Sequence, residues 1–284
     1  MKNPSIILKI AGLSLKIPSF LKIFLEDTFK HFLFPEHKVK SHFWHLELKR
    51  IKKRDFYKEK FFALKKRLAN FKIDLKKINP YYYPIKIDSQ NKRILYFSSN
   101  TKKVNSSFIP YLYSLLLALN KGILLHAACV VKQNKAYLFL GSTGEGKSTV
   151  AWLSQNYLVL SDDVLAVKKI KNQFIAFATP WKQKPFIQPK PYAGFPLKAI
   201  FFLKKAKRIF FKPLKKEAAL VRILSSHIHF FLFTERPLVD KLFFTAVDLV
   251  KSIPSYEMEF MKDKDFWPNL ERVLINNKYA KRRA

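Results

Sequence analysis

Glycine is scarce in this sequence, which contains six glycines in 284 residues. Three of them, Gly141, Gly144 and Gly146, fall within the single stretch Gly141–Ser148. Glycine is the default residue where the backbone turns sharply or approaches a ligand closely. In a glycine-poor chain this clustering predicts a loop with a function.

Cysteine is almost absent, since Cys129 is the only one in the sequence. A single cysteine excludes a framework of internal disulfides and fits a reducing compartment. Cys129 lies in the apolar stretch Leu124–Val131, which is typical of a buried strand. We therefore predict that it fills space in the core.

Long uninterrupted hydrophobic runs are also missing. The apolar stretch Ile6–Leu25 is broken by Lys9, Lys16, Pro18 and Lys22. A membrane-spanning helix needs about 20 apolar residues, and no small-residue cleavage site of a signal peptide follows the stretch. Its alternation around Ala11-Gly12 predicts a strand hairpin instead, and we expect a cytoplasmic protein with no membrane span.

Acidic residues are few: 20 Asp and Glu stand against 54 Lys and Arg, which gives a formal charge of +34. Such an excess can indicate nucleic acid, an anionic membrane surface or an acidic partner. Most of the basic residues are lysines scattered over the whole length, and the tail Lys278–Arg283 is a short basic run that contains one aromatic residue, Tyr279. We therefore expect solvated basic faces and only non-specific nucleic-acid binding.

The sequence predicts two regions, an N-terminal α+β region of unknown role over residues 1–104 and a phosphate-loop domain over residues 105–284. There are no internal repeats, and the proline-rich segment Thr179–Pro196 is predicted to be a loop. Predicted helices are Phe20–Leu33, Phe108–Leu119, Ser148–Leu153, Glu217–Ser225, Leu238–Lys251 and Phe266–Leu274. Predicted strands are Ile6–Ile10, Leu13–Ile17, Phe43–Leu48, Tyr83–Ile87, Ile94–Ser98, Leu124–Val131, Ala136–Leu140, Tyr157–Ser161, a strand after Asp163 that reaches Val167, Phe174–Ala178, Ala199–Leu203 and Tyr256–Phe260.

The stretch Gly141–Ser148 reads G-x-x-x-x-G-K-S, the pattern of a phosphate-binding loop. An apolar strand precedes it and a predicted helix follows, so that backbone N–H groups and the helix N-terminus would face one anion. Lys147 would neutralise phosphate charge, and the Ser148 hydroxyl would ligate Mg²⁺. The predicted nucleotide-binding residues are Gly141, Ser142, Thr143, Gly144, Glu145, Gly146, Lys147, Ser148 and Thr149.

Two adjacent acids, Asp162 and Asp163, follow the predicted strand Tyr157–Ser161. A nucleotide site needs carboxylates to complete the Mg²⁺ shell and to orient or deprotonate the attacking nucleophile. A polar turn that merely ends a strand is the alternative. Because the pair follows the phosphate loop by one helix and one strand, we favour catalytic roles, with a metal role for Asp163.

His126 lies inside the apolar strand before the loop. A lone histidine in such a strand is more often a core residue than a functional one. A hairpin through Gln133-Asn134-Lys135 would, however, bring His126 near the strand ends that carry Gly141 and Asp162. We therefore include His126 among the candidate catalytic residues.

Three segments in this order resemble the HPr kinase/phosphorylase group, which is related in fold to ATP-dependent phosphoenolpyruvate carboxykinase. They are Leu125–Ala128, the loop G-S-T-G-E-G-K-S-T, and Leu160–Val164. Thr179–Trp181 and Pro196–Leu203 resemble a branch of stand-alone relatives, some of them associated with peptide modification.

The resemblance implies that His126 assists proton handling beside the acidic pair. One aspartate would be the base for a serine hydroxyl, and the other would serve the metal with Ser148. The sequence has no counterpart of the family's glycine-containing signature with an acidic residue, because Thr179–Pro189 offers Trp181 and lysines instead. Phosphorylase activity and HPr as substrate are therefore not carried over.

The sequence thus predicts an α/β fold, a P-loop nucleotide-binding domain of HPr-kinase/PEP-carboxykinase type with an N-terminal α+β extension. We expect an ATP- and Mg²⁺-dependent kinase whose acceptor is a serine-type hydroxyl on a protein or peptide, with a homo-oligomer possible. Three alternatives stay open: a small-molecule kinase, a non-catalytic ATP-binding regulatory module and a nucleic-acid-dependent ATPase.

Overall fold

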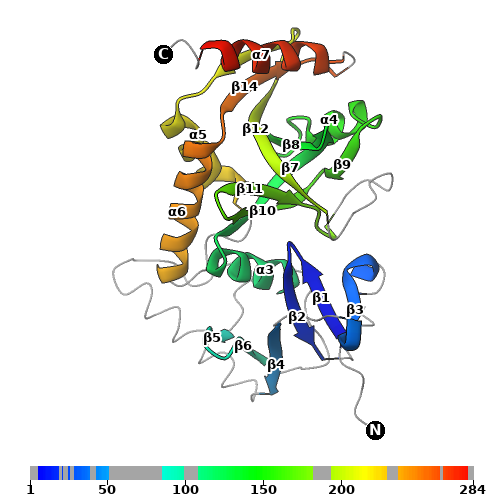
Figure 1. Ribbon diagram of the computed structural model, residues 1–284, viewed down its shortest axis with the longest axis vertical. Helices are drawn as coiled ribbons and strands as arrows, with labels where there is room; N and C mark the ends of the chain where they lie inside the picture. Colours follow the sequence, from blue (N-terminus) through cyan, green and yellow to red (C-terminus); the bar gives the residue numbers. More distant parts are fainter. Residues whose placement is uncertain are drawn as a thin grey trace, which may run out of the picture. The chain divides into compact units, whose positions relative to one another are not determined.

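The protein has a mixed α/β fold with two sheets (Figure 1), seen here in a computed structural model. The chain divides into two compact units, Met1–Tyr113 and Ser114–Ala284. The structure describes residues 6–18, 21, 25, 29–38, 43–50, 85–98, 108–181, 193–228, 236–262 and 265–280.

The first unit begins with the predicted hairpin, which is confirmed. Strands β1 (Ile6–Ile10) and β2 (Leu13–Ile17) pair antiparallel, with Ile10 opposite Leu13. The two turn residues, Ala11 and Gly12, have φ values of 52° and 73°. Positive φ at both central positions gives a turn whose twist matches that of the paired strands.

The sheet of this unit has the order β3-β1-β2-β4-β6-β5, with β2–β4 and β4–β6 parallel. A turn over Ser89–Lys92 joins β5 to β6. The helix predicted over Phe20–Leu33 falls largely outside the described residues, and its described end differs: Lys30–Phe32 is a 3-10 turn that leads into β3. The remaining strands are β3 (Leu33–Pro35), β4 (Trp44–Arg50), β5 (Ile85–Asp88) and β6 (Arg93–Ser98), and a 3-10 turn spans Glu36–Lys38.

Helix α3 (Phe108–Leu119) is confirmed with the predicted bounds, and the division between the units falls inside it. The second unit contains an eight-stranded sheet of order β11-β10-β7-β8-β12-β14-β13, with β9 on β7. Its strands are β7 (Gly122–Lys132), β8 (Lys135–Leu140), β9 (Leu158–Ser161), β10 (Val164–Ile170), β11 (Gln173–Phe177), β12 (Gly194–Lys205), β13 (Phe210–Pro213) and β14 (Ser255–Phe260).

Three strands at the centre of this sheet are parallel: β8 and β14 lie on either side of β12. Strand β7 pairs with β8 in the predicted antiparallel hairpin, which is confirmed. The hairpin turns at Gln133 and Asn134, and both residues have positive φ. Strand β11 also pairs with the start of β12, so that β11, β10, β7, β8 and β12 form a closed circuit of pairings. The carboxyl ends of β8 and β14 therefore lie at one edge of the sheet, and their amino ends lie at the other.

Helices pack on this sheet, with α4 over β7 and β8 (Figure 1). An aromatic core that includes Phe139, Phe201 and Trp267 lies beneath α4 and α7. The indole Nε1 of Trp267 donates a buried hydrogen bond of 3.0 Å to Ser154 Oγ, which fixes the end of α4 against α7. The helices are α4 (Lys147–Leu153), α5 (Lys216–Arg222) continued by a π-turn over Ile223–His227, α6 (Arg236–Ser252) and α7 (Trp267–Ala280).

Several predicted boundaries in this unit differ from the structure; α7, for example, continues to Ala280 instead of ending at Leu274. The proline-rich loop predicted over Thr179–Pro196 lies mostly outside the described residues, but β12 already begins at Gly194 and includes Pro196. A proline is tolerated near the start of a strand or beside an irregularity, and the β12–β8 register shifts between Leu197 and Ala199. Among the described helices, none is both long and apolar enough to cross a membrane.

Candidate functional site

The glycine-rich stretch forms a loop between β8, which ends at Leu140, and α4, which begins at Lys147. Gly144 and Gly146 have φ values of 85° and 114°. A Cβ on Gly146 would lie 2.3 Å from Cζ of Phe260, the last residue of β14. Both the backbone conformation and the buried ring therefore require glycine at position 146.

Lys147, the first residue of α4, is buried and folds back over the loop. Its Nζ donates hydrogen bonds of 2.7 Å to Gly141 O and 3.2 Å to Ser142 O. Burial lowers the pKa of the Lys147 ammonium, and the carboxylates of Asp163 and Glu145 partly offset this effect by attraction. Lys147 is therefore a desolvated cation in electrostatic contact with two acids.

Glu145 lies within the loop in an arrangement that the sequence did not predict. Its Oε2 accepts a hydrogen bond of 2.5 Å from Ser142 N, and its own N–H donates to Ser142 O at 3.1 Å. A Cβ added to Gly141 would come within 3.1 Å of this carboxylate. Glu145 is the fourth variable position of the motif, and this position carries no pattern that could have indicated a carboxylate bound to a loop amide.

The acidic pair forms a bend between two strands that both run antiparallel to β7. Strand β9 pairs with the second half of β7 and β10 with the first half, and the Asp163 carbonyl accepts from Ala127 N at 2.8 Å between them. The Ser161 hydroxyl closes the turn, because it donates to Val164 O at 2.9 Å and accepts from Asp163 N at 3.2 Å. The bend inserts no extra residue opposite β7, because Ser161 is opposite Cys129 and Val164 is opposite His126.

The two aspartates of this bend have different surroundings. Asp162 is 1% exposed, whereas the Asp163 side chain is 25% exposed. The Asp163 carboxylate lies 3.0 Å from His126 Nε2. His126 is opposite Val164 in the β7–β10 register, and its neighbour Ala127 is opposite Leu140, the last residue before the loop.

Thr179, which follows β11 by two residues, forms a hydrogen bond next to this bend. Its buried hydroxyl donates to the Val164 carbonyl, the acceptor that Ser161 also uses. Thr179 stands in the sequence segment Thr179–Trp181 that carries part of the resemblance. Its contact, however, depends on long-range pairing that the sequence alone does not reveal.

The structure thus brings together the loop, Lys147, Asp163 and His126. Ser148 and Thr149 are half-buried in the first turn of α4. Within the described part of the chain, no group of three or more His, Cys, Asp and Glu side chains gathers as a ready-made metal cage. Hydroxyl and carboxylate oxygens are nevertheless the donors that Mg²⁺ prefers, and one or two protein ligands beside substrate phosphates are usual for it.

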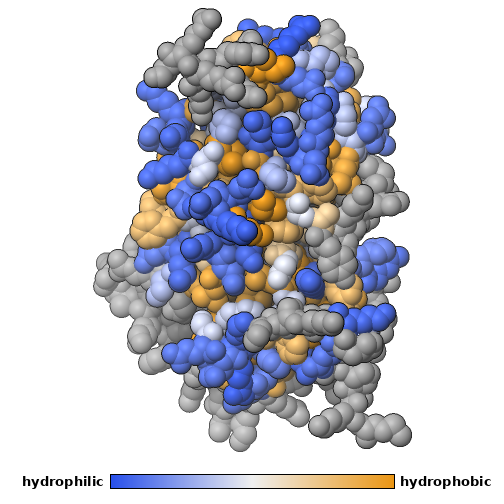
Figure 2. All heavy atoms as spheres, in the orientation of Figure 1, coloured by the Kyte–Doolittle hydropathy of each residue, from blue (hydrophilic) through white to orange (hydrophobic). Residues whose placement is uncertain are grey.

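The surface of the described residues mixes polar and apolar side chains. Hydrophilic residues are spread over the face seen in Figure 2, with smaller hydrophobic areas between them. Several basic side chains are paired locally, as Arg93 is with Glu47 at 2.7 Å and Arg208 with Glu259 at 2.6 Å.

Comparison with known proteins gives a matching family and matching solved structures. No curated protein matches the sequence. Among solved structures, the HPr(Ser) kinase/phosphatase from Coxiella burnetii matches with 14% sequence identity over 57% of this chain and 99% of that chain, at a TM-score of 0.30. The family described as SynChlorMet cassette protein ScmC matches residues 100–275, which are more than half of the sequence. The chain therefore belongs to the ScmC family.

Proposed function

We propose that this protein is an ATP-dependent phosphotransferase that transfers the γ-phosphoryl group to a serine-type hydroxyl on a protein or peptide. One observation carries the proposal: a glycine loop between a strand and a helix places a buried lysine beside an aspartate that is paired with a histidine. Phosphoryl transfer depends mainly on positioning and on charge stabilisation, and these are the groups it requires.

The loop residues fit a nucleotide phosphate. Two glycines at positive φ leave the loop without side chains where the backbone curves, so its N–H groups can approach an anion. Lys147 is already desolvated, and a phosphate oxygen would be a stronger partner for its ammonium than the neutral carbonyls of Gly141 and Ser142. Bound Mg-ATP would supply the transferable phosphoryl group and a cation that neutralises its charge.

Asp163 is the better candidate to meet the acceptor hydroxyl. It is the more exposed member of the pair, and His126 holds its carboxylate at 3.0 Å. Asp163 would accept the proton of the hydroxyl, while His126 would orient the carboxylate and share the proton. Asp162 lies in the same bend, but because its side chain is 1% exposed, it cannot contact a protein substrate in this conformation.

The metal roles predicted for Ser148 and Asp163 remain predictions. If Asp163 binds the cation, it cannot at the same time act as the base, and Asp162 would have to turn outward. The two assignments differ in their effect on nucleotide affinity. Loss of a metal ligand weakens Mg-ATP binding, whereas loss of a base lowers turnover at unchanged affinity.

The test uses radiolabelled ATP with a lysate of the host, followed by identification of the labelled acceptor. We expect labelling by the wild type, and a decrease of about 10²-fold or more for Asp163→Asn, since a positioned base contributes about that much. His126→Gln should lower the rate less while leaving the melting temperature nearly unchanged. Full transfer by Asp163→Asn would remove the base role, and absence of Mg-ATP binding by calorimetry would remove the whole proposal.

A non-catalytic ATP-binding module is the second candidate, and the Glu145 contact favours it. A carboxylate on a loop amide competes with phosphate for that amide and adds negative charge beside the site. A protein that binds Mg-ATP but labels no acceptor and releases no phosphate would have this function.

A further inference from the structure

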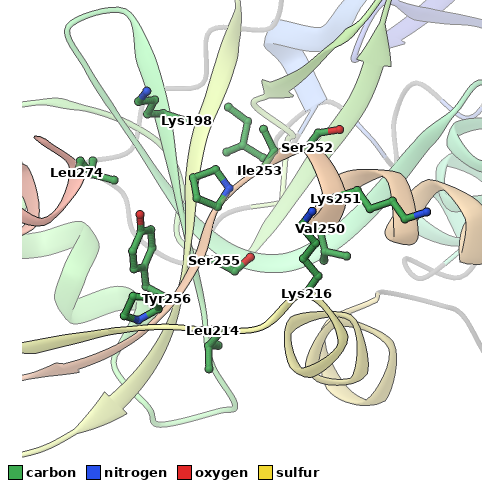
Figure 3. A pocket seen from close by; sticks show the side chains of 13 residues that line it. Lys198, Leu214, Lys216, Val250, Lys251, Ser252, Ile253, Ser255, Tyr256 and Leu274 are labelled. Carbon is green, nitrogen blue, oxygen red and sulfur yellow. The ribbon is translucent and has the colours of Figure 1, made fainter. Parts of the chain in front are cut away.

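A pocket of about 510 Å³ lies in the second unit, away from the glycine loop. It is formed at the amino ends of β12 and β14, beside the end of α6 and the start of α5 (Figure 3). The loop and Phe260 are at the carboxyl ends of β8 and β14. The pocket and the glycine loop are therefore at opposite ends of the same parallel strands.

The pocket has a largely apolar wall, and the polar side-chain groups of its buried lining residues are the hydroxyls of Ser255 and Tyr256. Leu197, Val250 and Tyr256 are buried residues of the wall. Ser255, which is 6% exposed, also lines the pocket. Its Oγ is shielded from solvent and has no hydrogen-bond partner among the residues that the structure describes.

An unsatisfied buried hydroxyl costs about 1–3 kcal/mol, so folded proteins rarely retain one without a partner. Its partner in solution is either a ligand or a bound water. The neighbouring backbone carbonyls already have hydrogen-bond donors other than the Ser255 hydroxyl. The Ser255 carbonyl accepts from Leu214 N at 2.9 Å, and the Pro254 carbonyl accepts from Ile200 N at 3.0 Å. The hydroxyl is thus left to a molecule inside the pocket.

The charged groups around the pocket are all positive. Lys198, Lys216 and Lys251 line it, and none has an acidic partner among the described residues. In Figure 3 the Ser255 hydroxyl points toward the side on which Lys216 stands. Exposed lysines are common in a chain of charge +34, so the lysines alone would carry no argument. Together with the hydroxyl and the apolar wall they define the chemistry of a ligand.

We propose that this pocket binds a small organic anion whose carboxylate or phosphate lies between Ser255 and Lys216 and whose apolar part contacts Leu197, Val250 and Tyr256. The volume is within the range of about 300–1,000 Å³ that is usual for small-molecule sites. The site is independent of the proposed phosphotransfer, because neither the loop Gly141–Ser148 nor Asp162 or Asp163 lines the pocket.

Ligand-observed NMR with three probes tests the proposal on the full chain. The probes are benzoate, phenyl phosphate and the neutral analogue benzamide. We expect at least one anion to bind with a Kd below about 1 mM and benzamide to bind at least tenfold more weakly. Lys216→Gln and Ser255→Ala should each weaken binding of that anion at least fivefold. Ser255→Ala should leave the melting temperature unchanged or raise it, because it removes an unsatisfied group.

The matched control is Lys207→Gln, which removes one exposed lysine in the segment that joins β12 to β13, at the other end of these strands. This variant should bind the anion as the wild type does. Equal loss in Lys207→Gln and Lys216→Gln would show non-specific attraction by the basic surface and overturn the proposal. Binding of neither anion, equal binding of benzamide, or an unchanged Kd in Ser255→Ala would overturn it as well, and would leave water as the partner of the hydroxyl.

Discussion

Substitution of the loop glycines tests the geometry on which the proposed nucleotide site depends. Gly146→Ala places a methyl group on a backbone with φ of 114° and 2.3 Å from Phe260 Cζ. The left-handed backbone costs an L-residue about 1–2 kcal/mol. Overpacking against a buried ring adds about 1–3 kcal/mol. The ring cannot swing away, because Phe260 is 2% exposed and belongs to the aromatic core.

Gly144→Ala is the matched control, since its φ of 85° carries the backbone cost but nothing lies within 4 Å of the added Cβ. We therefore expect urea denaturation to show a loss of about 1–2 kcal/mol for Gly144→Ala and about 2–5 kcal/mol for Gly146→Ala. In a double-mutant cycle, Phe260→Leu should cost less in the Gly146→Ala background than in the wild type. Equal losses for the two alanine variants, with no coupling to Phe260, would refute the packing of the loop against β14.

Three further substitutions or conditions probe the charges of the second unit. Lys147→Met should abolish Mg-ATP binding measured by calorimetry, while the melting temperature stays equal or rises. Burial lowers the pKa of the Lys147 ammonium, so its charged form disfavours folding at neutral pH, and this penalty should fade as pH rises through the lowered pKa. A large drop in melting temperature would contradict this explanation. Glu145→Gln should tighten Mg-ATP binding by up to about tenfold, which is ~1.4 kcal/mol, since it removes a carboxylate from a loop amide; weaker binding would instead give Glu145 a positive role. Duplex DNA should bind no more tightly than about 10⁻⁶ M at physiological salt and should leave ATP turnover unchanged, and stimulation of turnover would promote the nucleic-acid-dependent ATPase.

Most of the second unit could be predicted from its sequence because local signals agree there with the final fold. The apolar runs of β7 and β8 are separated by Gln133-Asn134, and both residues adopt positive φ. Asparagine tolerates this conformation well, so the sequence itself indicates a hairpin turn at this point. The glycine motif between a strand and a helix likewise indicates one local geometry. Helix α3 has its apolar residues at helical spacing, and both of its bounds were correct.

The errors occur where the structure depends on partners distant in sequence. The edge strand β13 is a four-residue segment, Phe210–Pro213, whose pairing with β14 gives no periodic signal of its own. Strand β12 begins before Pro196 because β11 pairs with it there, which overrides the local preference of a proline-rich segment for a loop.

The same reason limits what the sequence could say about the site. The order His126, Gly141–Ser148, Asp162-Asp163 predicted that these residues approach one another, and the register of β7 with β8 and β10 brings them to one region of the sheet. The sequence could not distinguish the two aspartates. The bend that contains them is held by hydrogen bonds from the Ser161 and Thr179 hydroxyls. It buries the Asp162 carboxylate and places the Asp163 carboxylate beside His126.

The parallel strands impose a condition on any experiment that compares the two candidate sites. Strand β14 begins at Ser255 in the pocket and ends at Phe260 beside Gly146. Six residues of strand span about 20 Å, so direct electrostatic effects between the two ends are largely screened at physiological salt. A core substitution in β14, such as Met258→Ala, would loosen both ends at once and reveal nothing about coupling. Surface variants at one end, Lys216→Gln or Glu145→Gln, leave the strand intact, and only a response to these at the opposite end would demonstrate that the sites communicate.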